Sequence, residues 1–279
     1  MHKNSQQLLR LRILNLFLFL FLSTPIFFFG CAQDEDRDLR TDLPTEANQL
    51  FSLSRLQYES VFIALTSFDE FKDEENLSIP GCPTILIEEE AKRVTLTFDS
   101  KEDCEGSDRR TGTIVLDLAL QDATDPVWFM EFKDYAFDTD TINGIKSFRQ
   151  MVQTQVTESF EGLKVKSESQ TSFEINGEFS HSINDPFDLG NSLISSQGEI
   201  NGRNPAGRNV KSTNSQSIIS AKSCSLAENN LPISGEEIWV VQRGNSNSVT
   251  HTLEYETAGV CETTAKMILP DGRNLILNP

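Results

Sequence analysis

The chain has 279 residues, with 42 acidic and 24 basic side chains and a formal charge of −18. So acidic a chain lacks the basic face that a phosphate backbone requires, and we expect no nucleic acid partner. Apolar residues make up 38% of the chain, which excludes disorder throughout. The length allows one or two domains.

Residues 1–30 have the pattern of a signal peptide. Basic side chains precede an apolar run at 13–29, and the small residue Gly30 stands directly before Cys31. This leader holds three of the 24 basic residues and no acidic residue, so the mature chain has 21 basic against 42 acidic side chains. The predicted mature protein therefore has a net charge of −21.

The tetrad Phe28-Phe29-Gly30-Cys31 resembles a bacterial lipobox. In that interpretation Cys31 becomes the first mature residue and carries acyl chains such as palmitate. Each buried CH₂ of an acyl chain contributes about 0.8 kcal/mol, and two or more chains anchor a protein stably in a membrane. The alternative is an uncleaved signal anchor or a transmembrane helix, for which the apolar run is short.

Residues 31–46 are polar and acidic, and we interpret them as a tether behind the lipid anchor. Ala32 is not the aspartate that retains an enteric lipoprotein at the inner membrane. The acidic cluster at 34–38 resembles the export signal of surface-exposed lipoproteins in Bacteroidota, although an acidic tether also serves simply to stay solvated. We expect an outer-membrane lipoprotein, with exposure at the cell surface as the finer alternative.

Residues 47–76 are predicted to be helical. From Ala47 to Phe71, apolar side chains recur mostly at steps of three and four, which indicates one amphipathic helix or two short ones. Such a helix packs most often against one face of a sheet, and binding to a partner is the alternative.

Residues 77–279 are strand-like, so the predicted fold class is mainly β. We expect an antiparallel meander or sandwich-like arrangement, preceded by the N-terminal amphipathic helix. Asn-Gly and Asp-Gly are strong hairpin signals, because both turn residues adopt positive φ. Four such pairs predict turns: Asn143-Gly144, Asn176-Gly177, Asn201-Gly202 and Asp271-Gly272.

The stretch from Asn184 to Ser220 is poor in apolar residues and predicts exposed hairpins, long loops or a linker. Two related units, at about 77–183 and 210–279, are a further alternative to one β domain. The motifs Thr95-Leu96-Thr97-Phe98 and Thr252-Leu253-Glu254-Tyr255 support it, because each precedes a cysteine by the same step.

With Cys31 assigned to the lipid, an even number of cysteines remains, and an exported chain commonly joins these as disulfides. Four cysteines allow three pairings. We favour the local one, because strand-like segments flanking an acidic turn bring the first two together. The expected disulfides are Cys82–Cys104 and Cys224–Cys261. Closely spaced cysteine pairs, typical of zinc sites, do not occur, and we expect no metal.

The cysteine blocks resemble those of uncharacterised β-rich lipoproteins of Bacteroidota. The residues that carry the resemblance are Cys82-Pro83-Thr84, Thr95-Leu96-Thr97-Phe98-Asp99, Cys104, Asp108-Arg109-Arg110-Thr111-Gly112, Cys224, Gly235, Leu253-Glu254-Tyr255 and Gly259-Val260-Cys261. This chain lacks the glycine before Arg109 and has Glu254 where the family tends to have aspartate. The resemblance implies a lipid-anchored, disulfide-bonded, antiparallel β protein, and it transfers no catalytic residue.

The sequence identifies no catalytic residue and no cofactor. It contains no G-x-S-x-G elbow, H-E-x-x-H pair or P-loop, and His181 and His251 stand alone. The densest aromatic stretch contains Trp128, Phe129, Phe132, Tyr135 and Phe137, and we single out Trp128, Phe132 and Tyr135. These rings are candidates for stacking on a ligand such as a sugar, and core packing is the main alternative.

The leading functional hypothesis is a non-enzymatic lipoprotein of the cell envelope, held in the membrane by its lipid. Its β platform would bind a protein or a glycan. The alternatives are an accessory glycan-degrading hydrolase and an envelope-assembly factor that carries a lipophilic cargo. A sheet face with exposed aromatic rings would favour the binding platform. A cleft with two convergent carboxylates would favour the hydrolase, and an apolar cavity would favour the cargo carrier.

Overall fold

The structure is a computed structural model that describes residues 42–73, 77, 79–99, 110–167, 171–186, 188–224, 231–244, 247–259 and 261–277. The chain from residue 41 onward forms one compact unit. The predicted leader, the predicted lipidation site Cys31 and the first part of the predicted tether lie outside the described residues.

Within this part of the chain, a single antiparallel sheet contains thirteen strands in sequence order. Each strand pairs with the next along the chain, which is a meander. The predicted fold class, mainly β with a preceding helix, is confirmed. The strands are β1 (Thr84–Glu88), β2 (Arg93–Phe98), β3 (Arg110–Asp117), β4 (Val127–Phe137), β5 (Asp140–Val152), β6 (Gln155–Lys166), β7 (Ser172–Ile183), β8 (Leu193–Arg203), β9 (Asn209–Ala221), β10 (Ser234–Arg243), β11 (Asn247–Gly259), β12 (Glu262–Ile268) and β13 (Asn274–Leu277).

Short helices accompany the sheet. They are α2 (Leu43–Glu59), α3 (Val61–Leu65), α4 (Phe68–Lys72), and the single 3₁₀ turns η2 (Leu189–Asn191) and η3 (Lys222–Cys224). Helix α2 begins at Leu43, before the predicted start at Ala47, because the Asp42 side chain caps it by accepting a hydrogen bond from the Thr45 amide. Helix α4 begins with a capping box between Ser67 and Glu70.

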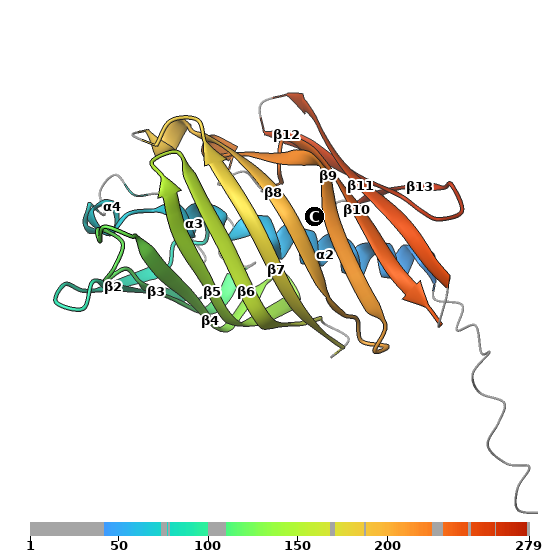
Figure 1. Ribbon diagram of the computed structural model, residues 1–279, viewed down its shortest axis with the longest axis horizontal. Coiled ribbons are helices and arrows are strands. Elements are labelled where there is room, and N and C mark those ends of the chain that lie inside the picture. Colours follow the sequence, from blue (N-terminus) through green and yellow to red (C-terminus); the bar gives the residue numbers. More distant parts are fainter. Residues whose placement is uncertain are drawn as a thin grey trace, which may run out of the picture. The chain divides into compact units, whose positions relative to one another are not determined.

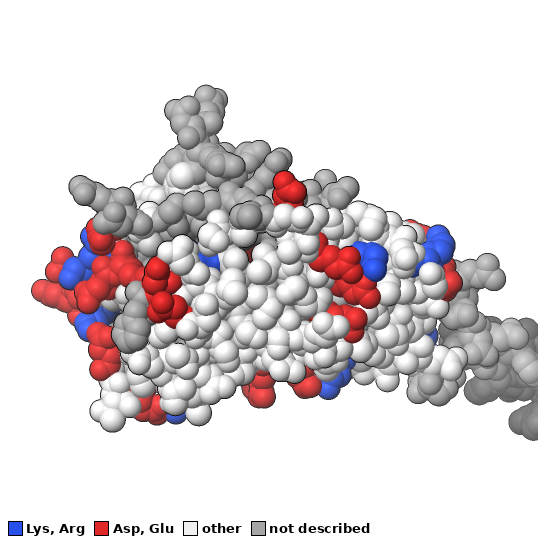
Figure 2. Space-filling model, turned by 90° about the horizontal axis from the view of Figure 1, so that it is seen from above, with Lys and Arg blue, Asp and Glu red and all other residues white. Residues whose placement is uncertain are grey.

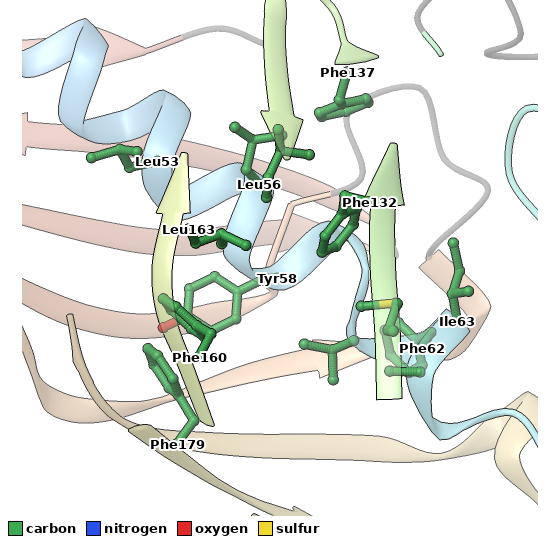
Figure 3. Packing of buried hydrophobic residues seen from close by; sticks show 14 of the residues in the cluster. Leu53, Leu56, Tyr58, Phe62, Ile63, Phe132, Phe137, Phe160, Leu163 and Phe179 are labelled. Atoms are coloured by element: carbon green, nitrogen blue, oxygen red, sulfur yellow. The ribbon is translucent and has the colours of Figure 1, made fainter. Parts of the chain in front are cut away.

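The sheet curves around α2, so the helix lies against its inner face. Polar contacts from α2 reach β3–β6 on one side and β9–β11 on the other. In Figure 1, strands β5 to β9 cross in front of this helix. Figure 3 shows Leu53, Leu56 and Tyr58 of α2 among side chains of the strands, including Phe160 and Phe179. The helix is thus part of the core rather than a cover on an outer face.

Burial of α2 extends around most of its circumference. Even polar side chains of this helix are almost completely buried, including Glu46, Ser54, Gln57 and Glu59. A helix that covered only one side of a sheet would bury a single stripe. The inner face of the sheet therefore meets α2 over several strands at once.

Three of the four dipeptides that predict turns lie inside strands, so those three predictions are wrong. Asn143-Gly144 lies in β5, Asn176-Gly177 in β7 and Asn201-Gly202 in β8, while Asp271-Gly272 lies in the turn between β12 and β13.

Packing, not turn geometry, explains the glycines at 177 and 202. A Cβ on Gly177 would lie 2.3 Å from the Phe160 ring, and one on Gly202 would lie 2.2 Å from the Glu174 carbonyl oxygen. Glycine at these positions therefore allows close approach on the inner face. The asparagine that precedes each one points outward and is exposed.

The apolar-poor stretch from Asn184 to Ser220 contributes β8 and most of β9, which pair with each other as a hairpin of the main sheet. Their outward positions are occupied by Ser, Asn, Gln, Lys and Glu, while Ile194, Ile200 and Ile218 point inward and are buried. Low hydrophobicity here reflects strands with one polar face.

Candidate functional site

A groove on the outer face of strands β4–β10 is the main candidate site. It consists of two adjoining hollows, one of about 640 Å³ over β7–β10 and one of about 500 Å³ over β4–β8. Asn176 and Asn201 line both hollows, so the two adjoin at this pair of residues. The groove crosses the strands on the face opposite α2, which is the face turned toward the reader in Figure 1. We call it the outer groove.

Strand register explains why the sheet is hollowed at this place. Phe129, Ser147, Ser159, Glu178 and Glu199 are successive cross-strand partners from β4 to β8. The two serines are small, and their hydroxyl oxygens are 2.8 Å apart. Larger side chains flank them on both sides, which leaves a depression over β5 and β6.

Two asparagines occupy the centre of the outer groove. Asn176 of β7 and Asn201 of β8 are direct cross-strand partners, and the Asn176 Nδ2 lies 3.4 Å from the Asn201 Oδ1. The Gly162 amide donates to the Asn176 Oδ1 at 2.8 Å, which fixes the orientation of that amide. A side-chain amide has two N–H donors and two lone pairs, so these bonds leave further hydrogen-bonding capacity.

Toward β10, amides and a lysine line the groove. Asn209 of β9 donates from Nδ2 to the Gln242 Oε1 at 2.8 Å, and the Lys211 Nζ lies 2.8 Å from the Glu199 carboxylate. Arg203 of β8 is the cross-strand partner of Glu174 on β7. Basic groups in the groove are thus matched by acidic ones.

The charged groups of the described surface are mostly acidic. Figure 2 shows groups of red acidic atoms, gathered most densely at the end that carries β2 and α4, with uncharged white surface between them. Within the groove itself, Glu178 is directly opposite Glu199. The site therefore presents hydrogen-bonding groups in an environment that does not attract anions.

The three ring residues predicted as ligand contacts lie on the inner face. Trp128, Phe132 and Tyr135 are 3%, 2% and 1% exposed. The Trp128 indole donates to the Ala64 carbonyl oxygen at 2.7 Å, and the Tyr135 hydroxyl lies 2.9 Å from the Glu59 carboxylate. Burial raises the pKa of Tyr135 well above its ordinary value. These contacts correspond to the core-packing alternative.

The ring that does face solvent is their neighbour Phe129, which is 42% exposed and lines the outer groove. Every other described Phe, Tyr and Trp side chain is buried. Phe129 belongs to the recognised aromatic stretch but was not among the predicted ligand contacts, although a signal was present. The polar residues Glu131 and Lys133 share its parity along β4, and polar residues at alternate positions mark the solvent-facing side of a strand.

A second polar cluster is enclosed between α2 and the inner face of the sheet. The Lys146 Nζ lies 2.9 Å from the Glu158 carboxylate, which also contacts His181 Nε2 at 2.9 Å and accepts from Gln57 Nε2 at 3.0 Å. The His181 Nδ1 is 2.8 Å from the Ser196 hydroxyl. Burial alone would raise the pKa of Glu158, but Lys146 and the bond from His181 lower it to about 2.

Comparable contacts hold the N-terminal part of α2. The Glu46 carboxylate meets the guanidinium of Arg243 and the Nε2 of His251, which lies 2.8 Å away. Those contacts outweigh burial and lower the pKa of Glu46. Glu237 accepts hydrogen bonds from Ser54 and Trp239, and burial raises its pKa. The interior polar groups are thus engaged with α2 and serve its placement.

The predicted Cys224–Cys261 disulfide is confirmed, with an S–S distance of 2.01 Å. It joins η3, after β9, to the turn between β11 and β12. The other predicted disulfide, Cys82–Cys104, involves Cys104, which lies outside the described residues. That pairing stays a prediction.

Among the described residues, no group of three or more His, Cys, Asp or Glu side chains is arranged to hold a metal ion. No helix in that same part of the chain is both long and apolar enough to span a membrane. No protein family model, no curated protein and no solved structure matches this chain.

Proposed function

We propose that the chain is a lipid-anchored lipoprotein of the outer membrane whose β-sheet serves as a platform for binding a protein or a glycan. The observation that supports this function best is the outer groove, whose two adjoining hollows are lined by hydroxyl, amide and charged side chains and end at an exposed ring. The lipid anchor rests on the lipobox-like tetrad that ends at Cys31, and exposure at the cell surface rests on the acidic residues that follow it.

The arrangement supports binding more than the two alternative functions. A carrier of lipophilic cargo needs an apolar space, and the inner face of this sheet is filled by α2. A glycan hydrolase needs an acid and a second carboxylate on either side of the bond it breaks. Glu178 and Glu199 are neighbours in the groove, but the Glu199 carboxylate is paired with Lys211.

A variant that fills the groove tests this function. Ser159 is exposed at the bottom of the hollow over β5 and β6, so Ser159→Tyr places a ring where the ligand would lie. The matched control is Thr97→Tyr, which makes a similar change at an outward position of β2, away from the groove. Tyrosine is favourable in strands, and thermal unfolding will show whether both variants fold as the wild type does.

The measurement is affinity electrophoresis of the mature chain without its lipid-carrying first residue, that is residues 32–279, through gels that contain a defined probe. The probes are a neutral β-glucan, a neutral mannan, anionic polygalacturonate, and a mucin glycoprotein before and after removal of its glycans. We expect at least one probe to retard wild type and Thr97→Tyr equally and to leave Ser159→Tyr unretarded. Equal retardation of Ser159→Tyr, or no retardation of wild type by any probe, would contradict the function. Release of reducing ends would indicate the hydrolase instead.

A further inference from the structure

We infer that the ligand of the outer groove is an uncharged polysaccharide chain, which lies across the strands with one sugar ring against Phe129. This inference rests on the proposed binding function and narrows it to one class of ligand. Five features of the groove support it: the paired backbone beneath it, the chemistry of its side chains, its exposed ring, its length and its charge.

Strand pairing determines how a ligand can be recognised here. Strands β4–β10 lie inside the sheet, and each is paired on both sides. Their backbone N–H and C=O groups are used in the ladders, so a peptide cannot add to them as a further strand. A ligand in the outer groove must be recognised by side chains alone.

Those side chains suit hydroxyl-rich ligands. Ser147, Ser159, Asn176, Asn201 and Gln242 all line the groove, and hydroxyl and amide groups both donate and accept hydrogen bonds. Sugar hydroxyls also donate and accept. A row of such groups at successive strands therefore matches a chain of sugar hydroxyls without requiring one fixed direction for each bond.

The exposed ring supplies the apolar contact that a sugar needs. Phe129 is 42% exposed, and Ile145, which lies diagonally from it on β5, is 51% exposed. Both line the end of the groove over β4 and β5. A pyranose ring has one face of C–H groups that can cover an aromatic ring while its hydroxyls reach the adjacent serines.

The dimensions suit a chain rather than a single sugar. Adjacent strands are about 4.8 Å apart, so the six steps from β4 to β10 span about 29 Å. The two hollows adjoin at Asn176 and Asn201, and so they follow one another from Phe129 toward Gln242. Several consecutive sugar rings fit along this path.

Charge favours a neutral glycan over an acidic one. Glu161, Glu178 and Glu199 line the hollow over β4–β8, and Lys211 is paired with Glu199. The mature chain has a net charge of −21, which repels polyanions at low ionic strength. Uronic acids and phosphates would therefore meet an unfavourable field.

A protein ligand fits these observations less well. The core of a protein interface is rich in large apolar and aromatic side chains, surrounded by a polar rim. The outer groove has the reverse arrangement, with polar groups along its length and its exposed apolar side chains at one end.

Substitution of the exposed ring tests the inference. The probes are the neutral β-glucan, the neutral mannan and polygalacturonate, and the variants are Phe129→Ala and Phe129→Trp. The matched control is Leu86→Ala, which shortens an apolar side chain that is 59% exposed on β1, away from the groove. Binding is measured by the retardation of the mature chain as the concentration of polysaccharide in the gel is varied.

We expect a neutral polysaccharide to bind, with about fivefold to tenfold weaker binding by Phe129→Ala and unchanged binding by Leu86→Ala. Phe129→Trp should bind at least as tightly as wild type, because the larger ring keeps the stacking surface. Unchanged binding by Phe129→Ala, while Ser159→Tyr fails to bind, would overturn the assignment of the ring. Groove-dependent binding of polygalacturonate alone would overturn the neutral-glycan inference and leave the binding function in place. Binding that survives Ser159→Tyr, or no binding by wild type, would count against both.

Discussion

The Lys146 Nζ lies 2.9 Å from a carboxylate oxygen of Glu158, and neither side chain has any solvent exposure. Both residues point from the inner face of the sheet toward Gln57 of α2, which donates to the carboxylate and accepts from the lysine. Burial of two charges is costly unless each finds its partner, so this pair is compatible with only one placement of the helix. The pair thereby fixes α2 against the inner face of β5 and β6.

Removal of the lysine should destabilise the fold strongly. In Lys146→Met the Glu158 carboxylate stays buried without its cation, which typically costs about 3–5 kcal/mol of unfolding free energy. Urea unfolding of the mature chain measures this loss. The control is Lys133→Met, since the Lys133–Glu131 pair is exposed and such pairs contribute about 0–1 kcal/mol. Equal losses in the two variants would contradict a structural role for the buried pair.

Low pH should remove the contribution of Glu158 to the unfolding free energy. Its pKa in the folded state is about 2, against 4.5 for an ordinary glutamate, because Lys146 and His181 outweigh the effect of burial. A lowered pKa stabilises the fold above pH 4.5, and this stabilisation is lost as the pH falls toward about 2. The unfolding free energy of wild type should therefore fall more steeply in this range than that of Glu158→Gln. Parallel curves for the two proteins would contradict the lowered pKa.

Glu237 provides a control, because its effect on the pH dependence of the unfolding free energy has the opposite sign. Its pKa is raised by burial, so the stability that it contributes is present below the ordinary pKa of a glutamate and is lost as the pH rises through the raised value. Glu237→Gln should remove that decline on the alkaline side. A variant whose stability depends on pH as wild type does would show that Glu237 titrates normally.

Loss of the disulfide should lower the stability of the C-terminal part of the sheet. Cys224 and Cys261 are 37 residues apart in sequence, and closure of a loop of that length contributes about 3–4 kcal/mol by restricting the unfolded chain. The double variant Cys224→Ala/Cys261→Ala leaves the remaining cysteines intact and should unfold at lower urea concentration. An unchanged midpoint would show that the crosslink does not stabilise the folded state.

The lipid anchor has its own test. Cys31→Ala removes the predicted acylation site, so the variant should move from the membrane fraction to the soluble fraction of expressing cells. Membrane retention of Cys31→Ala would contradict the anchor. Proteolysis of intact cells should then show whether the wild-type chain is accessible at the cell surface.

Much of the fold could be predicted from local pattern. Strand-like segments indicated a mainly β chain, and apolar steps of three and four indicated the helical segment. The position of α2 inside the sheet was not predictable. Polar residues of a helix, such as Gln57 and Glu59, are normally predicted to face solvent. Their hydrogen-bond partners lie on strands far away in the sequence, so the sequence does not reveal that they are buried.

The candidate site was predicted only in part. A ring cluster on β4 was recognised, but Trp128, Phe132 and Tyr135 point inward, and Phe129 is the one that faces solvent. An irregularity in the pairing of β4 with β5, between Phe132 and Tyr135, shifts the alternation and so puts even- and odd-numbered rings on the same face. Strand parity read from sequence does not reveal such a shift.

The Asn-Gly dipeptides at the centre of the groove are compatible with two local structures, a turn and a strand. Asn176-Gly177 and Asn201-Gly202 predicted hairpin turns, yet they place two asparagines side by side on the outer face and two glycines on the inner face. Local preference for positive φ favours the turn, whereas close packing against Phe160 and the β7 backbone favours glycine in a strand. Only the tertiary structure decides between them.

Calorimetric titration of the mature chain with fragments of a neutral polysaccharide, at low and at high salt, tests the central claim most directly. We predict a dissociation constant that is the same for wild type and Thr97→Tyr and that changes little with salt, because the ligand is uncharged. Ser159→Tyr should give no measurable heat of binding. A dissociation constant that weakens steeply with salt, or binding by Ser159→Tyr equal to that of wild type, would contradict recognition of a neutral glycan in the outer groove.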